Sequence, residues 1–248
     1  MLVVPGVFVY VHIPKTGGTF VRAVLEDLFG APIRVAPDAS KGAVFVRRLA
    51  RQSRSVAVGT HETIRACPEF ARSLPRVACL RNPFDRYVSQ FEFRWWTHDA
   101  NAFPGLDRLR GYPNIQFSDF LRYLNEALRP RRLPWAEGAG LGFQGAQLVH
   151  YLAEDEPSRG SSLEDVAGRT GLTLLRTQHL NQDVYEFLER HGVGGAEARR
   201  VLDWDPVLPP EGGRGGGAEW RPHYSDADLE YVIQHERSLL EAFPEFAP

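Results

Sequence analysis

Apolar runs of strand length alternate along this chain with longer segments in which apolar residues recur at helical spacing. The run at 7–12 is apolar at nearly every position and rich in β-branched and aromatic residues, which is typical of a strand buried on both faces of a parallel sheet. The segment at roughly 18–29 predicts a helix that ends at Gly30. The apolar positions of this helix are Phe20, Val21, Val24, Leu25 and Leu28.

The alternation continues to the end of the chain. Further strands are predicted at 55–61, 76–81 and 172–177. Helices are predicted at 67–74, 84–96, 117–128, 143–154, 182–192 and 225–243. This order predicts an α/β fold with a P-loop-like, doubly wound, mainly parallel central sheet flanked by helices. The chain has 248 residues, 43% of them hydrophobic, and we expect a single domain spanning 1–248.

A bare loop joins the first predicted strand to the first predicted helix. Its sequence from Lys15 to Thr19 is KTGGT. Free N–H groups and the dipole at a helix start attract anions, so this order of elements predicts a phosphate site. The P-loop NTPase signature ends in Gly-Lys-Ser/Thr, whereas Lys15 and Thr16 come before Gly17 and Gly18 here. We therefore expect a phosphate ligand other than ATP bound in the usual way.

The lysine in this loop stands out against the composition. Of 29 basic residues, only Lys15 and Lys41 are lysines. Arginine offers a rigid fork, while lysine offers a compact ammonium on a flexible stem that can follow a moving oxygen. The ammonium of Lys15 is therefore suited to follow the negative charge that develops during a transfer reaction.

A second anion site is predicted after the strand at 76–81. Arg81 ends that strand, Pro83 opens the next helix, and Ser89 lies one to two turns along it. An arginine and a hydroxyl near a helix start can bind one anion together. A ligand with phosphates on both sides of a ribose would satisfy both sites.

These two motifs carry a family resemblance. HIPKTGGTF at 12–20 and LRNPFDRYVSQF at 80–91 resemble the sulfotransferases that use 3′-phosphoadenosine 5′-phosphosulfate (PAPS), in the branch of uronyl 2-O-sulfotransferases and related carbohydrate enzymes. The resemblance implies that PAPS is the co-substrate and adenosine 3′,5′-bisphosphate the product. It also implies that the loop from Lys15 to Thr19 holds the 5′-phosphosulfate, while Arg81 and Ser89 hold the 3′-phosphate. Arg214, in the glycine-rich segment near the C-terminus, is a further candidate for the 3′-phosphate.

Sulfuryl transfer needs positioning and charge stabilisation more than covalent chemistry, by analogy with phosphoryl transfer. We expect Lys15 at the bridging oxygen, with the amides of Gly17, Gly18 and Thr19 and the hydroxyls of Thr16 and Thr19 on the phosphate. His61, just past a strand end, is the expected base, and the resemblance supports a histidine in this region. Glu62 is the alternative base. His12, before the loop, is a candidate for orienting Lys15.

Composition limits the partners. The net charge of −2 and pI of about 6.5 do not favour nucleic acid. Cys67 and Cys79 lack zinc-site spacing, and we expect two reduced thiols and no metal. The sequence has no apolar stretch of membrane-spanning length, and the anchor and stem of the eukaryotic relatives are not present, so we expect a soluble, cytoplasmic enzyme. The expected acceptor is a hydroxyl on a carbohydrate or a small molecule. The oligomeric state stays open.

Two alternatives follow from the same loop. A P-loop kinase or NTPase would need the Gly-Lys-Ser/Thr order and an acidic strand end for Mg²⁺, and the strands ending near His61 and Arg81 supply no such carboxylate. A non-catalytic nucleotide- or carbohydrate-binding module could do without Lys15 or His61, and both are present. The pattern favours a transferase.

Overall fold

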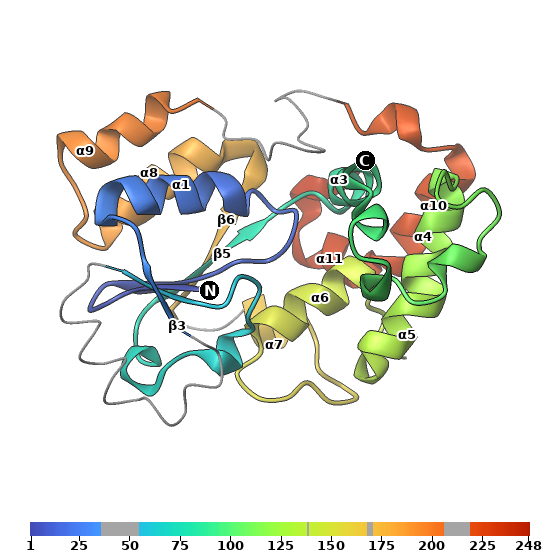
Figure 1. The fold of residues 1–248 in the computed structure, drawn as a ribbon, viewed down its shortest axis with the longest axis horizontal. Helices are drawn as coiled ribbons and strands as arrows, with labels where there is room; N and C mark the ends of the chain where they lie inside the picture. Colours follow the sequence, from blue (N-terminus) through green and yellow to red (C-terminus); the bar gives the residue numbers. More distant parts are fainter. Residues whose placement is uncertain (36–54, 138, 168–170, 206–218) are drawn as a thin grey trace. The chain divides into compact units, whose positions relative to one another are not determined.

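The fold is built on a mixed sheet. The computed structural model describes residues 1–35, 55–137, 139–167, 171–205 and 219–248. Within them six strands pair in the order β3-β4-β1-β2-β5-β6 (Figure 1). Their bounds are β1 Leu2–Val4, β2 Phe8–Val11, β3 Ile33–Val35, β4 Val56–Val58, β5 Arg76–Leu80 and β6 Leu172–Arg176.

The predicted α/β class is confirmed, with one antiparallel strand inserted. β3 pairs parallel with β4, and β2, β5 and β6 form a parallel set. β1 is antiparallel to both β2 and β4, and the sequence did not predict it because three apolar residues are too short a run to give a pattern. Since β1 reverses the direction twice, β2, β4, β5 and β6 all end at the same edge of the sheet.

In the described residues the α-helices have these bounds: α1 Gly18–Phe29, α3 Pro83–Phe93, α4 Phe117–Arg122, α5 Arg129–Arg132, α6 Phe143–Leu152, α7 Glu164–Ala167, α8 Leu180–Arg190, α9 Ala196–Arg199, α10 Asp226–His235 and α11 Arg237–Ala242. Single 3₁₀ turns lie between them. The helix predicted at 67–74 is only the 3₁₀ turn Glu69–Ala71, because Pro68 and Pro75 leave less than two helical turns between them.

Four other predicted elements are shortened or interrupted. The helix at 84–96 ends at Phe93, since Arg94 adopts a left-handed conformation with φ 51°. The helix at 117–128 becomes a π-helix over Tyr123–Leu128. The helix at 225–243 breaks at Glu236, whose buried carboxylate accepts hydrogen bonds from other elements. The strand predicted at 55–61 ends before Gly59.

The described chain forms two compact units. Unit 1 comprises 1–81, 151–155 and 169–208, and holds the sheet. Unit 2 comprises 82–150, 156–168 and 209–248, and is helical.

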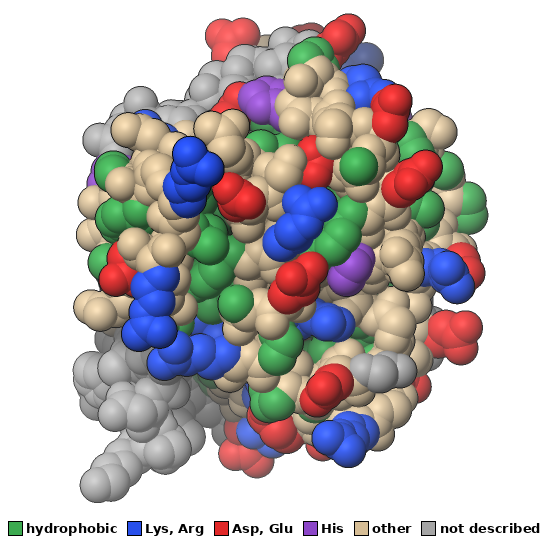
Figure 2. Space-filling view, turned by 90° about the vertical axis from the view of Figure 1, so that its right-hand side faces the viewer, with side chains coloured by type: hydrophobic (Ala, Val, Ile, Leu, Met, Phe, Trp, Pro, Cys, Tyr) green, Lys and Arg blue, Asp and Glu red, His purple; other side chains and the backbone are tan. Residues whose placement is uncertain are grey.

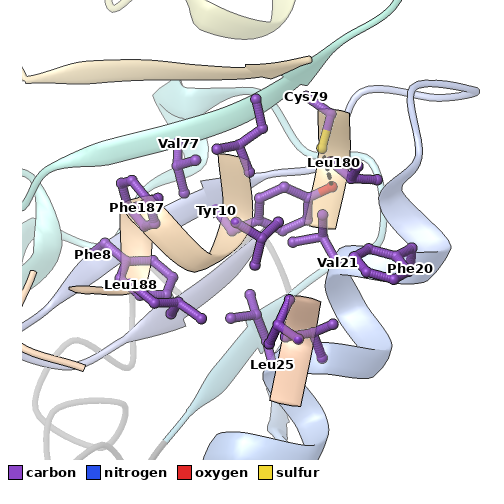
Figure 3. Close-up of a cluster of buried hydrophobic side chains, with 14 of the residues drawn as sticks. Phe8, Tyr10, Phe20, Val21, Leu25, Val77, Cys79, Leu180, Phe187 and Leu188 are labelled. Atoms are coloured by element: carbon purple, nitrogen blue, oxygen red, sulfur yellow. Dashed lines mark hydrogen bonds between the residues drawn. The ribbon is translucent and has the colours of Figure 1, made fainter. Parts of the chain in front are cut away.

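The core of unit 1 lies between the sheet and the helices α1, α8 and α9, which cover one of its faces (Figure 1). Phe8 and Tyr10 of β2 point into this layer with Val21 and Leu25 of α1 (Figure 3). The intervening strand residues, such as Val9 and Val11, point to the opposite face and are also buried. Burial on both faces explains why the strand at 7–12 reads as a continuous apolar run.

Candidate functional site

The loop after β2 has an unusual backbone. Lys15 has φ 63° and Gly17 has φ 92°, both in the left-handed region, and α1 begins at Gly18. A side chain at Gly17 would be strained and would also meet the Leu180 side chain at 2.8 Å. Strained backbone of this kind is frequent at ligand sites.

The start of α1 has backbone N–H groups that are free to bind a ligand. The first hydrogen bond into the helix is made by Val21 N to Gly17 O, at 3.3 Å. In the described part of the chain, the amides of Gly17, Gly18 and Thr19 donate to no protein acceptor. Helix-start amides without a partner are suited to phosphate oxygens. The residues predicted to bind phosphate thus fit that group.

The two threonines of the loop differ. Thr16 is buried and its hydroxyl donates to Ile13 O at 2.9 Å, so this side chain closes the loop. Thr19 is exposed at the first turn of α1. Thr19 is therefore the more accessible of the two predicted hydroxyls.

The histidine before the loop fills the space above Gly18. A Cβ at Gly18 would lie 2.0 Å from Nε2 of His12. Burial lowers the pKa of His12 to about 3, and the neighbouring His61 acts in the same direction. His12 is thus a neutral ring that packs against the loop at Gly18.

Arg81 lies beside the loop. β2 and β5 are neighbouring parallel strands, with Val11 opposite Ala78. One guanidinium nitrogen of Arg81 donates to Lys15 O at 3.3 Å. The backbone of one predicted site and the side chain of the other are therefore in contact.

Sequence reasoning missed Thr177, which follows β6. Its hydroxyl is 3.1 Å from Thr16 O and 2.9 Å from Leu80 O. This side chain ties the loop after β2 to the end of β5. The sequence does place the Thr177 hydroxyl directly after the predicted strand at 172–177. Recognising its role requires the pairing of β6 with β5, which the sequence does not show.

The end of β6 is itself anchored. The carboxylate of Asp183 accepts bonds from the backbone N and from two side-chain nitrogens of Arg176, at 2.7–3.0 Å. Burial acts to raise the pKa of Asp183, but the bonds from Arg176 outweigh it and hold the pKa below its ordinary value. Thr177 is consequently held at a fixed point on the sheet edge.

His61 follows β4 and packs on His12. The two ring centroids are 4.5 Å apart, and Nδ1 of His61 lies 3.4 Å from His12 O. Burial lowers the pKa of His61, while the contact with the His12 carbonyl raises it in part. The ring is half-buried, so one part of it is accessible to solvent. His61 has the neutral state and the accessibility that a general base needs.

The remaining predicted residues lie elsewhere. The side chain of Glu62 packs beside Gly59 in unit 1, next to His61 in the chain. Ser89 is a residue of unit 2, in α3, and its side chain is buried. Arg214 and the glycine-rich segment lie outside the described residues.

Cys67 and Cys79 are buried free thiols, as predicted, and Cys79 Sγ lies 3.6 Å from the Tyr10 hydroxyl (Figure 3). Among the described residues, no three His, Cys, Asp or Glu side chains are grouped to hold a metal ion. The helices described here include none with the length and apolar character needed to cross a bilayer.

Comparisons with known proteins found a matching family and a similar fold. The sequence model of the sulfotransferase family matches residues 5–137, a range that contains β2, the loop, His61 and Arg81. No protein with a curated description matches the sequence. A solved structure of mouse sulfotransferase SULT7A1 complexed with PAP has a similar fold, with a TM-score of 0.50 and 18% identity over 96% of this chain and 83% of that one. Since the family model matches more than half of the sequence, this chain belongs to the sulfotransferase family.

Proposed function

We propose that this enzyme transfers the sulfuryl group of PAPS to a hydroxyl of a carbohydrate or a glycosylated small molecule, with His61 as the base. One observation carries the proposal: the amides of Gly17, Gly18 and Thr19 have no protein acceptor among the described residues, and the Arg81 side chain donates a hydrogen bond to the same loop. The match of the sulfotransferase family to residues 5–137 supports PAPS as the donor.

The loop is assigned to the 5′ end of the donor. The amides of Gly17, Gly18 and Thr19, with the Thr19 hydroxyl, hold the 5′-phosphate, and the buried Thr16 keeps the loop closed. Arg81, Ser89 and Arg214 are assigned to the 3′-phosphate on the resemblance described above. PAPS supplies the activated sulfuryl group.

Lys15 is assigned to the charge that develops during transfer. As the bond between sulfur and the bridging oxygen breaks, negative charge builds on that oxygen and the ammonium of Lys15 stabilises it. By comparison with the deletion of a single oxyanion-hole donor, replacing Lys15 with alanine is expected to lower the rate by about 10²–10³-fold.

His61 is assigned to the acceptor. It takes the proton of the acceptor hydroxyl while the new oxygen–sulfur bond forms in line with the breaking one. Its lowered pKa leaves the ring neutral, and so able to accept a proton, at pH 7. Glu62 remains the alternative base. The variants His61→Gln and Glu62→Gln distinguish the two candidates, because only the loss of the true base lowers the turnover of bound donor.

The donor assignment is tested by thermal unfolding of the full chain with adenosine 3′,5′-bisphosphate, ATP or 5′-AMP. At about 100 times its dissociation constant, a ligand adds roughly 2.7 kcal/mol to the free energy of unfolding. We expect this increase with the bisphosphate alone, and a smaller one in Lys15→Ala and in Arg81→Ala. Arg34→Ala is the matched control, because Arg34 is an exposed cation on β3 of the same unit.

Two results would overturn the proposal. An equal or larger stabilisation by ATP would point to an NTPase-like enzyme. No stabilisation by any of the three nucleotides would leave a binding module without the proposed donor site.

A further inference from the structure

The segment that follows β6 lies against the loop from Lys15 to Thr19. The hydroxyl of Thr177 is 3.1 Å from Thr16 O, and a Cβ at Gly17 would lie 2.8 Å from Cδ2 of Leu180. All of these residues belong to unit 1, so the contacts are made within one compact unit. The proposed donor chemistry has so far given this segment no role.

The hydrogen bond to Thr16 O fixes the direction of the next amide. The peptide bond between Thr16 and Gly17 is trans, so its C=O and its N–H point in opposite directions from one planar group. Since the carbonyl points at the Thr177 hydroxyl, the N–H of Gly17 points away from the segment after β6. This N–H is one of the three amides assigned to the 5′-phosphate. Thr177 therefore orients a donor that it does not touch.

Packing confines the Gly17 backbone on the same side. A Cβ at Gly17 would point at the segment after β6, at 2.8 Å from Leu180 Cδ2 and 3.7 Å from Thr177 Cγ2. Leu180 belongs to the buried core of unit 1, near Tyr10 and Cys79 (Figure 3). Because this core is close-packed, the loop cannot move toward β6 without a clash.

The sheet sets the position of Thr177. Its hydroxyl also lies 2.9 Å from the carbonyl of Leu80, the last residue of β5, and Leu80 is paired with Arg176 of β6. Arg176 is in turn tied to Asp183 by three hydrogen bonds. A hydroxyl has a single hydrogen to donate, so the two carbonyls share it. Through Thr177 the loop is positioned by the end of the sheet.

A second side chain fixes the preceding peptide group of the loop. Arg81 donates to Lys15 O at 3.3 Å, while Thr177 donates to Thr16 O. Two successive carbonyls are therefore held by side chains that follow the neighbouring strands β5 and β6. Rotation of either peptide plane would break one of these bonds. The fold itself thus sets the direction of the amides, and donors oriented in this way need no reorganisation when they meet a charge.

We propose that Thr177 is a positioning residue for donor binding. Its hydroxyl holds the carbonyl of Thr16 and thereby directs the amide of Gly17 at the 5′-phosphate. This inference rests on the proposed function, because it needs a 5′-phosphate in the loop. Its consequence is selective: loss of the hydroxyl weakens binding of the 5′-phosphate and leaves binding of the 3′-phosphate unchanged.

The test is calorimetric titration of the full chain with adenosine 3′,5′-bisphosphate and with adenosine 3′-phosphate, which lacks the 5′ group. Thr177→Val keeps the shape of the side chain and removes the hydroxyl. We expect this variant to bind the bisphosphate about 3- to 10-fold more weakly, the effect of one ordinary hydrogen bond, and the 3′-phosphate as the wild type does. The ratio of the two affinities is the readout, because a general loosening of the fold would weaken both nucleotides alike.

Two further variants serve as controls. Thr177→Ser keeps the hydroxyl and should bind the bisphosphate as the wild type does. Thr173→Val is the matched substitution near the start of the same strand, beside Val77 of β5 and at the opposite end from Thr177. Melting temperatures show that each variant is folded.

Support requires that Thr177→Val lose affinity for the bisphosphate alone, while Thr177→Ser and Thr173→Val keep it. Equal losses for both nucleotides, or an equal loss in Thr173→Val, would reduce Thr177 to a structural role and overturn the inference. Unchanged binding by Thr177→Val would also overturn it and would leave the donor site in place. If the wild type binds neither nucleotide, the proposed function fails and this inference fails with it.

Discussion

Gly18 and His12 are matched in size at the start of α1. The half-buried ring of His12 occupies the position where a side chain at residue 18 would begin, and contact at 2.0 Å cannot be tolerated. We predict that Gly18→Ala lowers the free energy of unfolding by about 1–3 kcal/mol, as overpacking does, and weakens binding of adenosine 3′,5′-bisphosphate. Urea unfolding and the thermal shift measure the two effects.

The control for this prediction is Gly194→Ala, at a position where a Cβ would meet nothing within 4 Å. The double variant His12→Ala/Gly18→Ala tests the cause. If the clash with the ring is responsible, the double variant is more stable than the sum of the two single effects. Additive effects would show that the conformation of Gly18, and not its neighbour, sets the cost.

His61 gives a prediction about pH. Since burial lowers its pKa in the folded protein, the pKa measured by NMR titration of the imidazole is expected below 6.5, with His61→Gln identifying the signal. A base must be neutral, so activity should persist as pH falls to 6.5 and decline only below it. A pKa above 6.5 would contradict this.

The same shift has a consequence for stability. A histidine whose pKa is lower in the folded state than in the unfolded state binds its proton more readily when unfolded. His61 and His12 therefore do not lower the free energy of unfolding above pH 6.5, the ordinary pKa of an unfolded histidine. They lower it as pH falls below that value. For His12 the loss continues to about pH 3.

At the scale of elements, one carboxylate joins three helices of unit 2. Glu236, between α10 and α11, accepts hydrogen bonds from the amides of Gln144 and Gly145 at the start of α6, at 2.8 and 3.0 Å. It also accepts a bond from the Tyr87 hydroxyl of α3 at 2.6 Å. The side chain is fully buried, and burial raises its pKa although these three bonds oppose the increase.

We predict that Glu236→Ala lowers the free energy of unfolding by about 2–4 kcal/mol, because it leaves the buried amides of Gln144 and Gly145 without their acceptor and opens a cavity. Urea unfolding followed by circular dichroism measures this loss. Glu241→Ala, at an exposed position of α11, should change stability by less than about 0.5 kcal/mol. Similar effects in both variants would mean that the network contributes little.

At the scale of the whole molecule, the two units are not separate lengths of chain. The chain passes from one unit to the other at 81/82, 150/151, 155/156, 168/169 and 208/209. Neither core can therefore be completed from one continuous segment. We predict a single cooperative unfolding transition by calorimetry, in keeping with the proposed single domain.

Coincidence of the calorimetric and van't Hoff enthalpies checks this prediction. Tryptophan fluorescence adds a second probe, because four of the five tryptophans, including the buried Trp96, belong to unit 2 and only Trp204 belongs to unit 1. Two resolved transitions, with most of the fluorescence change in one of them, would show that the units unfold independently.

The surface of unit 2 carries charges of both signs. Figure 2 shows the side of the molecule where α4, α5 and α10 lie, and on it acidic and basic side chains are interspersed. A mixed surface of this kind does not attract polyanions over long distances.

The sequence by itself determined the elements that depend on local physics. Burial on both faces made β2 and β5 readable, and helical spacing with a terminal glycine gave the bounds of α1. The loop from Lys15 to Thr19 and the strand end at Arg81 were recognised for the same reason, since a glycine turn and a charged strand end are set by neighbours in the chain. These features identified the family.

Only the tertiary structure decided which distant residues meet. Thr177 and Thr16 are 161 positions apart, and Glu236 and Gly145 are 91 apart. Packing between distant segments also brings His12 against Gly18 and His61, and it breaks a predicted helix at Glu236. The sequence of one such segment carries no signal of the other. Local propensity sets where a strand or helix can form, whereas burial and hydrogen bonding across the fold decide where it ends and which side chains share a site.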